Sequence, residues 1–322
     1  MSDKNSILIR RNSIFLPPPL KKGDKVAIIS PASAVKDEYV FGAMERFMER
    51  GYEPILMPYA LGHESGSFAA SKSDRLMDLL DVIQDEEIKA VFCSRGGYGC
   101  AQLLPNFSYN LIASHPKWVI GFSDVSALLA LMYSSDVASI HGPMAKHLAT
   151  SGDNDSFSEA LLRILQNGGK FDIALTTNEL SRHGKARGTL VGGNFAVLNS
   201  LASTPYDILK VEEGEDVILF LEDISEAIYE VERMLSRLGM AGTLHKIKGL
   251  ILGNFSEYKP DKNFLTMEQM ADSFLRRFNI NNIPVAFSFP TGHSPENYPL
   301  VEGAEVELEI TPQFTRLKTI EH

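Results

Sequence analysis

Ser123 lies at an abrupt change in the hydrophobic pattern of the chain. Residues 118–120 form a short apolar run, as in a buried strand, whereas apolar residues recur at helical spacing between 125 and 132. A turn from strand to helix can expose a side chain and direct helix N–H groups to the same point, as in the nucleophile elbow. Gly121 fits that motif, but Val125 stands where its second glycine belongs. Ser123 is therefore either a nucleophile or a helix N-cap, because serine is also a preferred capping residue.

Two histidines are candidates for the base that a serine nucleophile requires. His293 lies in "FSFPTGHSPENYP", a loop rich in proline and glycine that follows an apolar segment, and His141 directly follows a predicted strand. Loops on a rigid scaffold often carry catalytic side chains. Both histidines also have a structural interpretation, so the residues alone leave the choice open.

A carboxylate candidate comes from "VILFLEDISEAIYEVERML", residues 217–235. Helical spacing predicts a helix that begins near Asp223, and Asp223 with Glu226 fits a capping box. Glu222 then lies at the end of an apolar strand, and the cap does not use its carboxylate. It is either the partner of an imidazole or an ordinary exposed acid.

The glycine cluster "SRGGYG", residues 94–99, predicts a tight turn. Gly96, Gly97 and Gly99 do not have the spacing of a dinucleotide-binding fingerprint. Successive N–H groups in such a turn can face an anion, which in acyl transfer is the tetrahedral oxyanion. A plain turn without a ligand is the alternative.

Composition excludes several classes of protein. Among 322 residues, 44% are apolar and 22% charged, and the net charge of −10 argues against a nucleic-acid partner. No apolar run has the length of a signal peptide core or a membrane span, so we expect a soluble, cytoplasmic protein without a membrane partner. Cys93 and Cys100 have no further ligands at metal-binding spacing, which predicts reduced thiols and no metal.

The first half of the chain alternates between strand and helix patterns, which predicts an α/β domain with a doubly wound parallel sheet. Ligands bind such a sheet beyond the carboxyl ends of its strands, where polar and glycine-rich segments cluster here. The expected strands are residues 25–30, 53–58, 89–94, 117–122 and 137–142.

The second half predicts a smaller α+β domain with a mixed sheet. Its expected strands include "VILFLED", "KGLILGNF" and a terminal "EVELEI", and one of its helices runs through "MEQMADSFLRRF". The chain is polar between about 150 and 187, which favours a connection. We therefore divide the chain into an N-terminal domain at 1–160, a linker at 161–187 and a C-terminal domain at 188–322.

Six segments in order, from "CSRGGYG", "IGFSDVSAL" and "HGPM" to "GTLVGGNFAVL", "FLEDISEAIYEVERML" and "GHSPEN", resemble the LD-carboxypeptidase family of serine peptidases. The resemblance runs from about residue 20 to the C-terminus. It implies an N-terminal domain like the class I glutaminase domains and a C-terminal swivelling domain. It further implies Ser123 as nucleophile, His293 as general base, Glu222 as the acid that orients it, and an oxyanion hole formed by the N–H groups of Gly97 and Asp124.

The resemblance also implies a substrate. Members trim murein peptides, so the expected reaction is hydrolysis of the amide between the L-centre of meso-diaminopimelate and the terminal D-alanine of a murein tetrapeptide, in cell-wall recycling, without metal or cofactor. This substrate is anionic and the chain is acidic, so we expect cations near the cleft: Arg95, Lys146, Arg182 and Arg187. Arg95 and Tyr98 are the candidates for binding the substrate carboxylate. After His293, Ser294 and Pro295 replace the charged residue that similar proteins often carry.

Two other functions remain open at this stage. Some members of the family cleave peptidyl-nucleotide antibiotics in self-immunity and stack the nucleobase on an aromatic residue of an inter-domain loop. Residues 150–187 offer only Phe157 and Phe171 for this, and Trp118 lies in the strand before the serine. The other function is a noncatalytic sensor that binds muropeptides. The sequence also leaves a homodimer open.

Overall fold

The computed structural model describes residues 13–62, 67–150 and 155–320. The first half of the chain folds around a six-stranded sheet in the order β11-β5-β4-β3-β1-β2. The pairs among β1 to β5 are all parallel, and β11 pairs with β5 in the antiparallel sense. The strands are β1 (Lys25–Ile29), β2 (Glu53–Leu56), β3 (Ile88–Cys93), β4 (Trp118–Gly121), β5 (Ser139–His141) and β11 (Leu300–Glu302).

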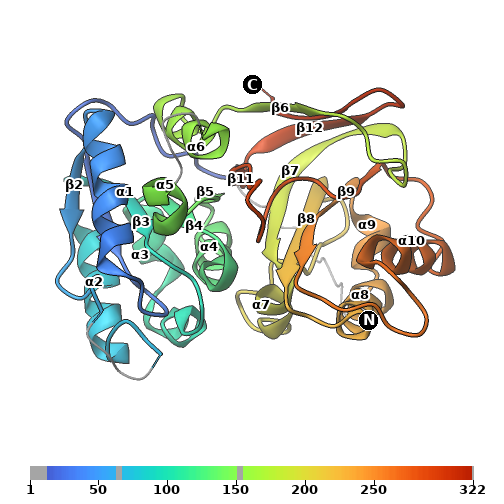
Figure 1. Cartoon of the computed structure of the whole chain (residues 1–322), viewed down its shortest axis with the longest axis horizontal. Helices are drawn as coiled ribbons and strands as arrows, with labels where there is room; N and C mark the ends of the chain where they lie inside the picture. Colours follow the sequence, from blue (N-terminus) through green and yellow to red (C-terminus); the bar gives the residue numbers. More distant parts are fainter. Residues whose placement is uncertain (1–12, 63–66, 151–154, 321–322) are drawn as a thin grey trace, which may run out of the picture.

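Helices surround this first sheet, on the left of Figure 1. Ser71 precedes helix α2, and its side chain caps the helix by accepting a hydrogen bond from the Asp74 N–H. Helix α4 is buried at every position but the last, as its nearly continuous apolar sequence requires. The helices of this half are α1 (Asp37–Glu49), α2 (Lys72–Gln84), α3 (Tyr109–Ser114), α4 (Ser126–Ser134), α5 (Ala145–Thr150) and α6 (Ser156–Gln166).

The second half is built on a seven-stranded sheet in the order β10-β9-β8-β7-β12-β13-β6. Strands β7 to β10 pair in parallel and the others antiparallel, so the sheet is mixed as predicted. The strands are β6 (Asp172–Leu175), β7 (Gly184–Asn194), β8 (Val217–Ile224), β9 (Gly249–Ser256), β10 (Val285–Ala286), β12 (Glu305–Ile310) and β13 (Thr315–Thr319). The helices are α7 (Phe195–Ser200), α8 (Ile228–Met240), α9 (Thr243–Lys246) and α10 (Met267–Arg277).

All the strands predicted in both halves are present, although "EVELEI" (β12) is followed by β13 and is therefore not terminal. Two further features differ from the sequence interpretation. The expected linker at 161–187 contains the end of α6, strand β6 and the start of β7. Apolar side chains of α6 are buried, although polar segments on both sides of it give the sequence the character of a connection. In addition, β11 belongs to the first sheet although it follows most of the second half in sequence. The domain boundaries themselves stay a prediction.

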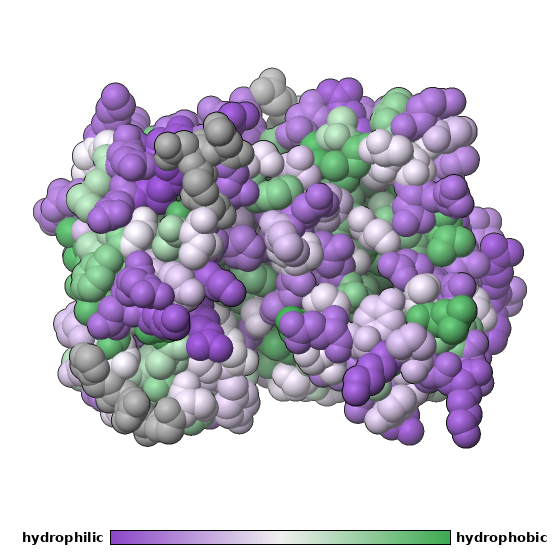
Figure 2. All heavy atoms as spheres, viewed as in Figure 1, coloured by the Kyte–Doolittle hydropathy of each residue, from purple (hydrophilic) through white to green (hydrophobic). Residues whose placement is uncertain are grey.

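The hydrophobic core is continuous between the two halves. One buried cluster contains both Ile120 of β4 and Phe220 of β8, and another contains both Leu128 of α4 and Leu198 of α7. Figure 2 shows that hydrophilic residues cover most of the face in view. Within the described residues, no helix has the length and apolar character that a membrane crossing requires. Residues 1–12, in which we predict no signal peptide, lie outside the described residues.

Candidate active site

Ser123 follows β4 directly, and its backbone is in the left-handed region with φ of 63°. Such a conformation is unfavourable for residues other than glycine and is concentrated at functional sites. Ser123 is the first residue of a single 3-10 turn, η3 (Ser123–Val125), which leads into α4. The cap positions of η3 and α4 are Phe122 and Val125, and neither has a side-chain cap. Ser123 is therefore not the N-cap that the sequence left as an alternative.

The glycine turn after β3 lies directly against Ser123. A Cβ on Gly96 would lie 2.9 Å from Ser123 Oγ and 3.1 Å from the backbone nitrogen of Asp124. Gly97 has φ of +106°, and a Cβ there would lie 2.2 Å from Ser33 Oγ. Because the turn packs so closely on its neighbours, neither position has room for a side chain. At Gly96 these neighbours are Ser123 and the backbone nitrogen of Asp124.

The Asp124 side chain fixes the far end of the same turn. Its Oδ2 accepts a hydrogen bond of 2.8 Å from the Cys100 N–H. The carboxylate is thereby occupied and buried, whereas the backbone nitrogen of Asp124 is on the side of Gly96. Gly97 and Asp124, the predicted oxyanion-hole residues, thus belong to adjoining turns at the carboxyl ends of neighbouring strands.

His293 and Glu222 are in direct contact, as the resemblance implies. The His293 Nδ1–H donates to Glu222 Oε2 over 2.7 Å, and the Glu222 side chain is fully buried. Burial raises the pKa of Glu222, but the charge of His293 and hydrogen bonds from His141 and His293 outweigh this and keep the pKa low. Burial has the opposite effect on His293 and lowers its pKa, but the charge of Glu222 outweighs burial, so the pKa of His293 is raised.

His141 contacts the same carboxylate, so both candidate bases lie at this site. Its Nε2 is 3.4 Å from Glu222 Oε1, and its ring is fully buried. Phe122 precedes Ser123, and the centroid of its ring lies near those of three histidine rings. The distances are 4.8 Å to His293, 5.8 Å to His141 and 6.2 Å to His147. The residue before Ser123 is thus in contact with the loop that carries His293.

The capping box predicted for Asp223 and Glu226 is wrong. Strand β8 continues through Ile224, and α8 begins only after Ala227, whose N–H donates to Glu230 Oε2. Asp223 is instead buried and accepts from Asn194 Nδ2 and from the backbone N–H groups of Ala196 and Ile224. Burial, together with the charge of Glu222, raises the pKa of Asp223 to about 7.

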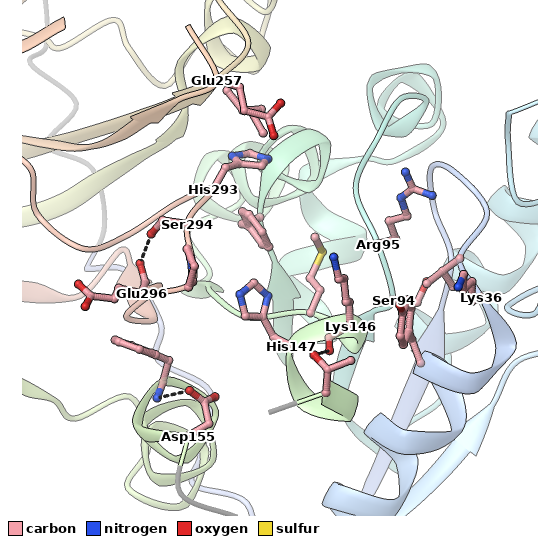
Figure 3. Close-up of a pocket in the computed structure, with 18 residues that line it drawn as sticks. Lys36, Ser94, Arg95, Lys146, His147, Asp155, Glu257, His293, Ser294 and Glu296 are labelled. Atoms are coloured by element: carbon pink, nitrogen blue, oxygen red, sulfur yellow. Dashed lines mark hydrogen bonds between the residues drawn. The ribbon is translucent and has the colours of Figure 1, made fainter. Parts of the chain in front are cut away.

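A cavity of about 1310 Å³ is lined by Phe122 and His293 (Figure 3), whereas Ser123 and Glu222 are not among its lining residues. Residues of the first half, among them Lys36, Arg95, Lys146 and His147, form one side of it, and His293, Ser294, Glu257 and Glu296 come from the second half. Burial lowers the pKa of His147. The cavity therefore lies between the two halves and carries charges of both signs.

The predicted cations and Tyr98 have different environments. Arg95 and Lys146 line the cavity. Arg182 instead pairs with Asp272, and Arg187 pairs with Glu307, both outside the residues that line it. Tyr98 is 60% exposed and packs against Phe68 with ring centroids 5.6 Å apart, also outside the lining residues.

The sequence did not identify several residues of the cavity. Lys36, His147 and Glu257 line it from segments that carry no recognisable motif, and Glu296 lies in the segment of His293 but was not singled out. No group of three or more potential metal ligands occurs in the part of the chain that the structure describes. Cys93 and Cys100 are free and buried, and burial raises the pKa of both thiols.

Comparison with known proteins identifies the class to which this two-domain α/β fold belongs. Residues 26–142 match the model of the LD-carboxypeptidase N-terminal domain, and residues 187–308 match that of the C-terminal domain. The chain therefore belongs to the LD-carboxypeptidase family, and it is an enzyme, a carboxypeptidase of the serine type.

Individual relatives are similar over most of their length. The chain is 31% identical to the "Probable murein peptide carboxypeptidase" of Bacillus subtilis, over 86% of this chain and 90% of that protein. It is 29% identical to the murein tetrapeptide carboxypeptidase of Pseudomonas aeruginosa, over 88% and 93%.

Solved structures share the fold. The muramoyltetrapeptide carboxypeptidase from Oxalobacter formigenes has a TM-score of 0.81 at 29% identity, covering 92% of this chain and 99% of that one. The microcin C7 self-immunity protein MccF, solved with aspartyl sulfamoyl adenosine, has a TM-score of 0.83 at 20% identity, covering 96% and 99%. At that identity the likeness to MccF shows the fold alone.

Proposed function

We propose that this enzyme hydrolyses the amide bond between the L-centre of meso-diaminopimelate and the terminal D-alanine of a murein tetrapeptide, with Ser123, His293 and Glu222 as its catalytic triad. The observation that carries the triad is the 2.7 Å contact of His293 with the buried Glu222, in a loop that packs on Phe122 next to the strained Ser123. The names of the relatives from Pseudomonas aeruginosa and Oxalobacter formigenes support the choice of peptide.

In the proposed mechanism, His293 acts through its Nε2, because its Nδ1–H is bonded to Glu222. Nε2 takes the proton of Ser123 as Oγ attacks the carbonyl carbon, and Glu222 stabilises the imidazolium that forms. The N–H groups of Gly97 and Asp124 stabilise the oxyanion. The imidazolium then protonates the leaving nitrogen, so that D-alanine departs and an ester with Ser123 remains. Water, deprotonated by His293, hydrolyses this ester and restores the serine.

The charges around the cavity suit a peptide with several carboxylates and a side-chain amine. Lys36, Arg95 and Lys146 lie across the cavity from His293 in Figure 3, and we propose that they bind carboxylates of the substrate. Glu257 lies beside His293 on the other side of the cavity, where it suits the free amino group of the diaminopimelate side chain.

The test is turnover of L-Ala-D-Glu-meso-diaminopimelate-D-Ala, followed by mass spectrometry. We expect release of D-alanine by the wild-type enzyme, and Ser123→Ala should lower kcat by about four to six orders of magnitude, as for nucleophile removal in other serine hydrolases. Ser134→Ala is a matched control, because Ser134 is a serine at the far end of α4 and does not line the cavity. Near-normal turnover by Ser123→Ala would refute the triad.

A second candidate function is cleavage of peptidyl-nucleotide antibiotics. Phe157 lines the cavity and offers an aromatic ring for a nucleobase, whereas Phe171 does not line it. The ring of Phe157 already packs edge-on against Tyr298, with centroids 4.8 Å apart. Incubation with both substrate types distinguishes the two functions. Because the chain is an enzyme of this family, we do not propose the noncatalytic sensor.

A further inference from the structure

The Glu222 carboxylate is held by two imidazoles, and the mechanism above uses only one of them. Oε2 accepts from His293, whereas Oε1 lies 3.4 Å from Nε2 of His141. The ring of His141 is buried between Phe122 and Phe220, with ring centroids 5.8 Å and 5.3 Å away. His141 therefore has no access to the cavity and can act on the reaction only through Glu222.

The surroundings of His141 define which of its nitrogens carries the proton. Its Nδ1 is buried and has no hydrogen-bond partner among the described residues. A neutral ring with its proton on Nε2 can donate to Glu222 and leaves only a lone pair unpaired on Nδ1. A protonated ring would instead bury an unpaired N–H on Nδ1, which is costly. The geometry therefore favours a neutral His141 that donates to Oε1.

The backbone on both sides confines Glu222. A Cβ on Gly292 would lie 2.4 Å from Glu222 Oε2, and one on Gly253 would lie 3.1 Å from Glu222 Cβ. The side chain is fully buried. Loss of the His141 donor therefore changes the charge that the carboxylate presents to His293 more than it changes the position of the carboxylate.

We propose that His141 is a positioning residue that shares the negative charge of Glu222 and so keeps His293 a weaker base than the full charge of the carboxylate would make it. This role rests on the proposed function. Without the donor, the full charge of the carboxylate would bear on the imidazolium of His293 and stabilise it. His293 would then stay protonated to a higher pH, and a protonated ring cannot accept the proton of Ser123.

Other ionisable groups also face this pair. Asp223 is next to Glu222 in β8, Glu257 follows β9, and His147 of α5 lies against the loop of His293. All three remain in a His141 variant, so a change between wild type and variant reports the loss of the donor.

The experiment compares three substitutions in the full-length protein. His141→Leu removes the donor, and His141→Asn carries an amide too short to reach Oε1, so it serves if the leucine variant does not fold. His141→Gln can place its amide N–H near the position of Nε2 and should restore the interaction. The titration of the His293 ring is followed by NMR in the absence of substrate, and kcat/KM is measured from pH 5 to 9.

We expect the midpoint of the His293 titration to rise by about 0.5 to 1 pH unit in the leucine and asparagine variants, which corresponds to loss of one hydrogen bond. The acid limb of kcat/KM should move with it, so that activity at pH 6 falls about 3- to 10-fold. The alkaline plateau should stay within a factor of two, and the glutamine variant should titrate like the wild type.

An unchanged or lowered midpoint in both donor-free variants would overturn the proposal. So would a glutamine variant that titrates like the leucine variant, or a fall of the alkaline plateau without a shift, which indicates a merely structural role. Because the NMR titration needs no substrate, it tests His141 even if the wild type does not cleave the tetrapeptide. A wild type that does not cleave the tetrapeptide would refute the proposed function and leave the role of His141 to be decided by the titration.

Discussion

Gly96→Ala tests whether the glycine turn must lie against Ser123, the proposed nucleophile. The new methyl group would be 2.7 Å from Ser123 Cβ and 2.9 Å from its Oγ. Carbon atoms in contact normally lie about 3.5 to 4.0 Å apart, so relief requires a displacement of about 1 Å. Gly96 is not among the residues with positive φ, so alanine is compatible with the backbone itself. The substitution therefore acts mainly by pushing Ser123 and Asp124 away from the turn.

A displacement of about 1 Å at a reacting centre costs about 100-fold in rate, and we expect kcat on the tetrapeptide to fall by about that factor. Release of D-alanine measures kcat, and circular dichroism with a thermal melt confirms folding. Gly249→Ala is the matched control, because Gly249 lies in β9 and the nearest atoms to its Cβ are side-chain carbons at 3.2 Å and beyond. A folded Gly96→Ala enzyme with kcat within threefold of the wild type would refute the reasoning.

Three further predictions concern charge, pH and the loop of His293. Lys146→Met should raise KM for the tetrapeptide about 10-fold with little change in kcat, because it removes a cation that lines the cavity; Lys248→Met, whose lysine pairs with Asp216, should leave both constants unchanged. Because the pKa of His293 is raised above 6.5, kcat/KM should increase with pH to a midpoint above that value. The same shift means that the free energy of unfolding contributed by His293 should be present below pH 6.5 and lost as the pH rises through the raised pKa. Urea unfolding of the wild type and of His293→Ala over this pH range measures that loss. Gly292→Ala should lower kcat at least about 100-fold, since its methyl group would meet Glu222 Oε2 in a backbone with φ of +109°; activity within threefold of the wild type would contradict the packing described here.

Local pattern in the sequence was enough to predict β1 to β5 and to place Ser123 at a turn from strand to helix. The change from a continuous apolar run to helical spacing marks the end of β4, and that junction holds Ser123 in its left-handed conformation. Glu222 was selected for an incorrect reason, because the capping box that set it apart does not exist. Asp223 is satisfied by Asn194 from another strand, and no local pattern predicts that contact.

The contacts that assemble the site join distant parts of the chain and could not be predicted from periodicity. His141 meets Glu222 across 81 residues, and His293 meets it across 71. Arg182 and Arg187 were expected near the cleft because the implied substrate is anionic, but each pairs with a carboxylate of the second half. Charge alone does not indicate which cations remain available to a ligand.

Strand β11 links the loop of His293 to the first sheet, although nearly all of its neighbours in sequence belong to the second. Leu300 lies opposite His141 at one end of this segment, and Gly292 forms a bridge with Asn254 of β9 at the other. A protease cut or gene split between the halves would therefore remove an edge strand from the first sheet and leave β5 with unpaired backbone groups, which favour aggregation. We infer that a fragment of the first half needs residues 300–302 to complete its sheet.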